Sequence, residues 1–184
     1  DKIPLSDFTK NEIEPMIESY MAVCDDTNAT FQALETIFPK KKRYQETAKI
    51  AFSSARKWGS VSFENLGTIF VGAPDKLFEE EIPDLLKMEM EAGRRVIVIG
   101  YYNKIWENIN ALPQNIKPLY GVILEDNIRK NAKKTLKFFR QEGVDVKIIS
   151  GDHAKTVSMI AKKAGLDHWE RVVDMSAFEN EPDY

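Results

Sequence analysis

The sequence is short of cysteine, of basic excess and of long apolar runs, and each shortage excludes a class of protein. Its one cysteine, Cys24, cannot form a disulfide within the chain, which fits a reducing compartment. Lys and Arg number 26 against 29 Asp and Glu, a net charge of -3, whereas a nucleic-acid surface needs a basic excess. The apolar run from Val96 falls far short of the ~20 residues that a bilayer demands. No signal peptide opens the chain. We expect a soluble piece that binds no nucleic acid and does not enter the membrane.

The first part of the chain mixes helical periodicity with short strands. Apolar residues recur at helical spacing from Asn11 to Val23, and Asn65-Leu66-Gly67 has the composition of a tight turn between two strands. Gly93 suits the end of a helix, because glycine tolerates the left-handed conformation found there. The pattern predicts helices over 11–23 and 29–38, strands over 47–52, 60–63 and 68–71, a helix from 74 to 93 broken at Pro83, and a strand over 95–101.

After Pro113 and Pro118 the pattern changes to strict alternation. It predicts strands over 119–124, 144–149 and 171–173, separated by helices over 128–142 and 154–164. Such alternation is typical of parallel pairing in a doubly wound sheet, but three strands are few for one, so we expect others to come from elsewhere. The sequence thus predicts an α/β protein in two parts. An α+β domain with an antiparallel sheet spans residues 1–115, and a partial Rossmann-like segment spans 116–184.

The predicted strand over 144–149 ends at Ser150, Gly151 and Asp152, directly before a predicted helix. Free backbone N–H groups and the helix dipole at a helix start favour an anion, and a small hydroxyl beside a glycine lets a phosphate approach closely. An ordinary strand-to-helix loop with Asp152 near the N-cap explains the same residues. The tripeptide alone leaves both interpretations open.

Five blocks of the sequence carry a resemblance to one family. They read FSSARKWGSVSF from Phe52, FVGAPDKLF from Phe70, EAGRRVIVIG from Glu91, LEDNIRKNAKKTL from Leu124 and KIISGDHAKTVSMIAKKAGL from Lys147. These blocks resemble, in the same order, the F-S-x-x-R-K-x-S-V, K-G-A-P-E, G-x-R-V-L, D-x-x-R and T-G-D-N motifs of cation-transporting P-type ATPases. The resemblance implies a nucleotide-binding domain followed by part of a phosphorylation domain of the haloacid-dehalogenase-like fold.

The first three blocks are implied to line an ATP pocket. An aromatic ring at Phe52 can stack on a purine, worth ~1–3 kcal/mol per base, although a core position would also explain it. Lys57 can reach an adenine edge or a phosphate, or it is a solvated surface lysine. Gly72 lets the backbone approach a ligand without a Cβ clash, or it belongs to a plain strand-to-helix turn. By resemblance the nucleotide-binding residues are Phe52, Ser53, Lys57, Gly72, Ala73 and Arg95.

The last two blocks carry the implied hinge and phosphoryl residues. Asp126 and Arg129 match an acid and a base at the hinge between the two domains of the family, although a helix cap and an unrelated surface arginine explain them equally. Ser150, Gly151 and Asp152 match the T-G-D turn, which holds the transferred phosphoryl group. On this reading the anion at the strand-to-helix turn is that phosphoryl group.

The sequence also departs from the family pattern. Val71 stands where K-G-A-P-E has its lysine, which removes one cationic contact to ATP and predicts weak binding. Phe31 falls near the position where many members place a carboxylate that contacts adenine. Ser150 keeps the hydroxyl of the usual threonine, whereas His153 replaces the usual asparagine.

Two family motifs are missing. The sequence has no D-K-T-G-T, which carries the phosphorylated aspartate, and no G-D-G-x-x-N-D after Gly165, which carries magnesium-binding carboxylates. We therefore expect an excised cytoplasmic piece that binds ATP without turning it over and has no catalytic or metal-ligating residue of its own. The parent protein would use ATP and Mg²⁺ to drive cation transport from the cytoplasmic face of a membrane. The implied partners are its remaining phosphorylation, actuator and transmembrane domains.

Two other hypotheses compete with the transporter. A free-standing haloacid-dehalogenase-like phosphatase would need a nucleophilic Asp at a strand end with a second Asp two residues later, and no predicted strand ends that way. A non-catalytic nucleotide-sensing or interaction module fits the same binding residues. The transported ion stays open, because the ion ligands of the family lie in membrane helices.

Overall fold

The computed structural model describes residues 1–8, 10–125, 128–151 and 154–174, which divide into two compact units. The first unit consists of the described residues up to Lys87 together with Val96–Leu124. The second consists of Met88–Arg95 and the described residues after Leu124. The predicted boundary between domains at residues 115 and 116 of this chain stays a prediction.

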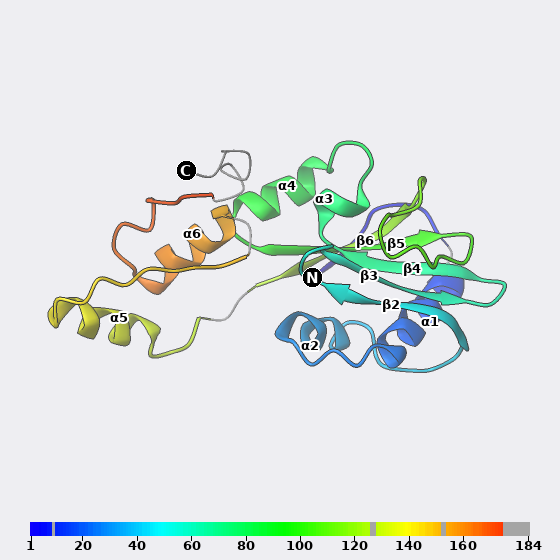
Figure 1. Cartoon of the computed structure of the whole chain (residues 1–184), viewed down its shortest axis with the longest axis horizontal. Helices are drawn as coiled ribbons and strands as arrows, with labels where there is room; N and C mark the ends of the chain where they lie inside the picture. Colours follow the sequence, from blue (N-terminus) through cyan, green and yellow to red (C-terminus); the bar gives the residue numbers. More distant parts are fainter. Residues whose placement is uncertain (9, 126–127, 152–153, 175–184) are drawn as a thin grey trace, which may run out of the picture. The chain divides into compact units, whose positions relative to one another are not determined.

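The first unit is built on one six-stranded antiparallel sheet in the order β1-β6-β5-β4-β3-β2 (Figure 1). The strands are β1 (Lys2–Pro4), β2 (Glu46–Ser53), β3 (Trp58–Phe63), β4 (Gly67–Gly72), β5 (Arg95–Tyr102) and β6 (Lys117–Leu124). The strands predicted over 47–52, 60–63, 68–71, 95–101 and 119–124 all lie within observed strands. The prediction of an antiparallel sheet is therefore confirmed. Strand β1 was not predicted, because three residues that include a proline are too few to show the alternation of apolar and polar residues that marks a strand.

The turn predicted at Asn65-Leu66-Gly67 joins β3 to β4. Asn65 and Gly67 both have positive φ angles, 57° and 102°. A Cβ on Gly67 would lie only 2.3 Å from the backbone oxygen of Tyr102, on the neighbouring strand β5. Glycine is therefore required here both for its conformation and for the close approach of the two strands.

The core of the first unit lies between the sheet and two helices, α1 (Lys10–Val23) and α2 (Ala29–Glu35). Asn28 caps α2, because its Oδ1 accepts a hydrogen bond of 2.9 Å from the backbone N–H of Phe31. Figure 1 shows α1 and α2 on the side of the sheet opposite to α3 (Pro74–Leu77). The buried sheet residues that pack against α1 and α2 include Val61, Phe63, Ile69, Val71 and Ile99.

A polar cluster links strand β6 to the start of the chain. The Tyr120 hydroxyl donates a 2.8 Å hydrogen bond to Oε1 of Glu14, and the Lys2 ammonium donates to the same oxygen at 3.0 Å. Burial opposes ionisation of Glu14, but the hydrogen bonds from Tyr120 and Lys2 outweigh it and hold the pKa of Glu14 below its usual value. The cluster therefore favours ionised Glu14 in the folded state.

The second unit contains α5 (Ala132–Gln141) and α6 (Ala154–Ala164), while α4 (Asp84–Glu91) spans the division between the units. Helix α6 coincides with its predicted range. Around it, the Ser158 hydroxyl donates to the Trp169 backbone oxygen at 3.0 Å, and the Lys162 ammonium lies 4.4 Å from the centroid of the Trp169 ring. Arg140 of α5 forms an ion pair with Asp167.

The predicted parallel, Rossmann-like arrangement is not found in the described residues. The segments 144–149 and 171–173 form no strand, so those two predictions are wrong. The third strand of the prediction, 119–124, exists as β6 but pairs antiparallel with β1. Extended backbone becomes a strand only when a neighbour satisfies its N–H and C=O groups. In the described second unit these segments have no such neighbour, and Ile149 is 98% exposed.

We predict that Tyr120→Phe destabilises the first unit by about 0.5–1.5 kcal/mol at pH 7, because it removes the hydrogen bond to ionised Glu14. A carboxyl whose pKa is lowered by folding contributes stability above its unfolded pKa, and this is lost as the pH falls through the folded value. The destabilisation should therefore shrink between pH 7 and pH 3 in urea unfolding experiments. Tyr44→Phe is the control, since the Tyr44 ring packs on Phe63 and, within the described chain, its hydroxyl has no hydrogen bond. An equal loss for both variants would contradict the role assigned to Tyr120.

Candidate functional site

Four of the predicted nucleotide-binding residues meet where β2 ends, β3 begins and β4 ends. Ser53 pairs with Trp58, which pairs in turn with Gly72 across β3 and β4. The backbone N–H of Lys57 donates to the Ser53 oxygen at 2.7 Å, and that of Ala73 donates to the Lys57 oxygen at 2.9 Å. The structure thus joins Ser53, Lys57, Gly72 and Ala73 through consecutive backbone contacts.

Lys57 occupies the left-handed region of backbone space, with a φ of 62°. Residues other than glycine adopt this conformation rarely, and they often do so at binding sites. The conformation brings the Lys57 oxygen against β4, where a Cβ on Gly72 would lie 2.8 Å from that oxygen and 2.8 Å from the Cβ of Trp58. Gly72 therefore allows the close approach of the Lys57 turn, and the approach of a ligand to its backbone stays a prediction.

The Phe52 ring lies at the surface of this site and not in the core. Phe52 is 42% exposed, whereas the neighbouring Trp58 is only 4% exposed. Trp58 packs against the Phe70 ring at a centroid distance of 5.9 Å, and the Arg56 guanidinium lies 5.5 Å from the Trp58 ring. Trp58 is thus the aromatic residue that packs into the protein at this turn. The ring of Phe52 is available for contact with a ligand.

The charge of Lys57 is partly balanced by an acid that the sequence interpretation missed. Its Nζ lies 3.8 Å from Oδ2 of Asp75, and Nζ of Lys76 lies 3.9 Å from the same oxygen. The Lys57 and Asp75 side chains are about half exposed, so solvent screens the pair and a stronger anion can replace Asp75. The signal that could have revealed Asp75 was its place in the first turn after Ala73-Pro74, where the resembling family motif has a glutamate.

Two departures from the family pattern are core residues in the structure. Val71 is 6% exposed and Phe31 is 5% exposed, and both belong to the hydrophobic cluster between the sheet and the helices α1 and α2. The Lys40 ammonium lies 5.0 Å from the Phe31 ring. These two positions contribute packing and no hydrogen-bonding side chain.

The remaining predicted site residues belong to the second unit. Arg95 is the first residue of β5, and Arg129, Ser150 and Gly151 lie in the segments around α5 and α6. Arg129 lines a small cavity of about 520 Å³ with Lys130, Asn131 and Thr135. Asp126 and Asp152 lie outside the described residues, so the roles assigned to this group stay predictions.

The described residues offer no cluster of three or more His, Cys, Asp or Glu side chains that could hold a metal ion. Among the described helices, none combines the length and the apolar character needed to cross a bilayer.

Comparison with known proteins identifies the relatives of this chain. No known family profile matches the sequence. The probable cation-transporting ATPase exp7 of Streptococcus pneumoniae serotype 4 is 37% identical over 181 residues, which cover 97% of this chain and 23% of the relative. The calcium-transporting ATPase CtpE of Mycobacterium bovis is 33% identical over 141 residues, which cover 76% of this chain and 18% of the relative. The chain thus spans about a quarter or less of the length of these curated relatives.

A solved structure supports the same relationship at the level of the fold. A zinc-transporting PIB-type ATPase in the E2.Pi state matches 90% of this chain and 25% of its own, with a TM-score of 0.53 and 14% identity. The fold is thus of the class found in ion-pumping ATPases. Together with the curated relatives, it shows that the chain belongs to the family of cation-transporting P-type ATPases.

We predict that Gly72→Ala destabilises the first unit by about 1–3 kcal/mol, because the added Cβ must displace the Lys57 turn or Trp58. Urea unfolding followed through amide signals of β3 and β4 measures the loss. Ser54→Ala is the control, since Ser54 is an exposed residue of the same turn and should change stability by less than about 0.5 kcal/mol. If Gly72→Ala proved as stable as Ser54→Ala, the close approach of Gly72 to Lys57 would be refuted.

Proposed function

We propose that the chain is the nucleotide-binding segment of a cation-transporting P-type ATPase and that ATP binds where Phe52, Ser53, Lys57, Gly72 and Ala73 meet. One observation carries the proposal. Residues selected by family resemblance from two separate blocks of sequence converge at one end of β2, β3 and β4 and are joined there by backbone hydrogen bonds. An exposed aromatic ring and a lysine of left-handed conformation lie at the same place.

Each of these groups has a distinct part in binding. The exposed Phe52 ring stacks on the adenine, as aromatic side chains do in other base-binding sites. The Lys57 ammonium leaves Asp75 for the more highly charged phosphates. The small side chain of Ala73 lets the phosphates or the ribose approach the backbone, while Gly72 lets the Lys57 turn pack against the end of β4. The site orients the nucleotide and performs no bond-breaking step itself.

The second unit is proposed to act on the phosphoryl group once the full-length protein is assembled. Arg95 reaches the nucleotide phosphates, and Asp126 and Arg129 form the hinge between the domains. Ser150, Gly151 and Asp152 hold the transferred phosphoryl group by hydrogen bonds and position. Mg²⁺ would neutralise phosphate charge in the full-length protein, but no step is assigned to it on this chain.

ATP binding by this chain alone is expected to be weak. Val71 and Phe31 are packed in the core, so neither a cation nor a carboxylate contacts the nucleotide from those positions. We expect a Kd on the order of 1 mM, which corresponds to about 4 kcal/mol of binding free energy.

We predict that Phe52→Ala weakens ATP binding by ~1–3 kcal/mol, which moves the Kd beyond the range of a millimolar titration. Because Phe52 is 42% exposed, the same substitution should change the free energy of unfolding by less than about 1 kcal/mol. Amide shifts near Lys57 and Gly72 during an ATP titration measure the affinity, and urea unfolding measures the stability.

Phe139→Ala is the matched control for Phe52→Ala. Phe139 is an aromatic residue of α5 with a similar exposure of 38%, and its removal should leave ATP binding unchanged. Unchanged binding in Phe52→Ala together with a large loss of stability would show that the ring serves the fold and not the nucleotide. Absence of shifts near Lys57 and Gly72 in the unmodified chain would refute the site altogether.

We predict that the chain forms no phosphoenzyme. Phosphoryl transfer to protein needs a positioned carboxylate nucleophile and a metal-held phosphate, and the sequence has neither D-K-T-G-T nor the downstream acidic motif. Incubation with radiolabelled ATP and Mg²⁺ should therefore leave no acid-stable, hydroxylamine-labile label, and phosphate release should stay at the blank rate. Label that maps to Asp126 or Asp152, or steady hydrolysis by the purified chain, would favour a free-standing phosphatase instead.

A further inference from the structure

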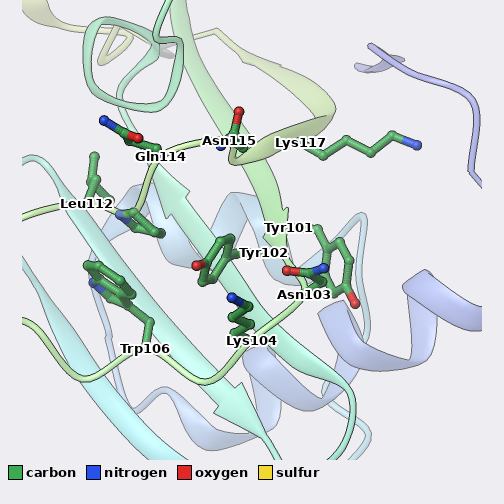
Figure 2. Close-up of a pocket in the computed structure, with 10 residues that line it drawn as sticks. Tyr101, Tyr102, Asn103, Lys104, Trp106, Leu112, Gln114, Asn115 and Lys117 are labelled. Carbon is green, nitrogen blue, oxygen red and sulfur yellow. The ribbon is translucent and has the colours of Figure 1, made fainter.

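A second cavity lies at the opposite end of the same sheet from the proposed ATP site. On β4, Gly72 pairs with Val98 at one end and Thr68 pairs with Tyr102 at the other, about 13 Å further along the strand. The cavity has a volume of about 760 Å³, which falls in the range of small-molecule sites. Its walls come from the end of β5, the segment 103–116 and the start of β6 (Figure 2).

Buried hydroxyl groups hold the wall of this cavity in place. Ser62 and Thr68 are fully buried on neighbouring strands, and their hydroxyls are 2.7 Å apart. Thr68 donates to the Lys104 oxygen at 2.7 Å, Ser62 donates to the Trp106 oxygen at 3.2 Å, and the Trp106 N–H approaches the Ser62 hydroxyl at 3.1 Å. The backbone of Lys104 and Trp106 is thereby fixed to the sheet before any ligand arrives.

Two aromatic rings of the cavity, those of Tyr102 and Trp106, pack edge to face. The rings of Tyr102 and Trp106 are 5.9 Å apart between centroids and nearly perpendicular, at 87°. The indole N–H of Trp106 already donates to the backbone oxygens of Asn108 and Ala111, both at 3.0 Å. The indole therefore offers a ligand its ring and not its N–H group, which disfavours proline-rich peptides that need a hydrogen bond from an aromatic groove.

Several polar side chains of the cavity have no hydrogen bond or ion pair within the part of the chain that the structure describes. The Lys104 ammonium has no ion pair there, and Figure 2 shows its side chain beside Tyr102 and Trp106. The amide side chains of Asn103, Gln114 and Asn115 likewise have no hydrogen bond in the described chain. By contrast, the Lys117 ammonium donates to the Asp7 oxygen at 2.6 Å.

The aromatic rings, the amide side chains and Lys104 together suit a ligand that has one planar base and one phosphate group. Aromatic rings suit a planar ring by stacking, and amide side chains, which both donate and accept, suit the edge of a nucleobase. A single lysine is a compact charge suited to one phosphate group. A polyphosphate would leave most of its charge unmatched, because Lys104 lies beside the two rings whereas the Lys117 side chain is directed away from them (Figure 2).

We propose that this cavity binds a nucleoside monophosphate, with its base against Tyr102 and Trp106 and its phosphate on Lys104. The site is separate from the proposed ATP site and does not depend on it, since the two share no residue. A ligand here would contact the segment 103–116, which connects β5 to β6.

A titration of the ¹⁵N-labelled unmodified chain with AMP tests the proposal by NMR. We expect saturable shifts in the amides of Tyr102, Lys104, Trp106 and Asn115 and in the Trp106 indole N–H. Lys104→Gln should weaken these shifts about tenfold or more, the loss expected for one charge-assisted hydrogen bond. Lys117→Gln is the matched control and should change the affinity by less than about threefold, since the Lys117 ammonium donates to the backbone oxygen of Asp7 and its side chain is directed away from Tyr102 and Trp106 (Figure 2).

Lys57→Gln separates the two sites. It should weaken ATP shifts near Phe52 and Gly72 and leave AMP shifts near Trp106 unchanged, so either proposal can fail without the other. Adenosine and inorganic phosphate, titrated separately, should each bind at least tenfold more weakly at Trp106 than AMP does. The proposal is overturned if AMP causes no saturable shift at Trp106, if Lys104→Gln binds AMP as well as the unmodified chain, or if phosphate alone reproduces the response.

Discussion

The pairing of β1 with β6 determines how the chain is divided. The Leu5 N–H donates to the Leu119 oxygen at 2.9 Å, and the Ile123 N–H donates to the Asp1 oxygen at 2.8 Å. The backbone nitrogen of Asp1 donates to the Ile123 oxygen at 3.0 Å. Because the chain's first residues satisfy the backbone groups of β6 on the side away from β5, β6 lies inside the sheet and β1 forms its edge. The chain after Leu124 therefore starts a new unit in which no described strand is present.

Local sequence patterns predicted most helices and strands, but they did not predict which strands pair with each other. Helix α6 and strand β4 follow from apolar periodicity and turn residues that lie next to them in sequence. The partner of β6 lies more than a hundred residues away, so no local pattern contains it. The segment 144–149 has the β-branched composition of a buried strand, yet Ile149 is 98% exposed because composition does not supply a neighbouring strand. The same composition in a complete parallel sheet would be buried.

The candidate site shows a similar division between residue type and geometry. Resemblance to the family selected Phe52, Lys57 and Gly72, but it could not predict the φ of 62° at Lys57. At that angle the oxygen of Lys57, just before β3, accepts the N–H of Ala73, just after β4. The sequence left open whether Phe52 is a core residue, and only the tertiary structure decides this, because burial depends on the packing of elements distant in sequence.

The alternation of side chains along β3 and β4 explains why one sheet has a distinct structure at each end. Val61 and Ile69 face the apolar core, and the adjacent Ser62 and Thr68 face the other side, as the period of two requires. Buried hydroxyls without partners cost stability, so the backbone of Lys104 and Trp106 must cover Ser62 and Thr68. The shape of the cavity is thus set by hydrogen bonds to the sheet.

At the other end of β3 and β4, Trp58 pairs with Gly72. Because Gly72 has no side chain, the Lys57 turn and the Trp58 side chain pack against its backbone. The surface at either end is therefore formed by the folding of the sheet itself.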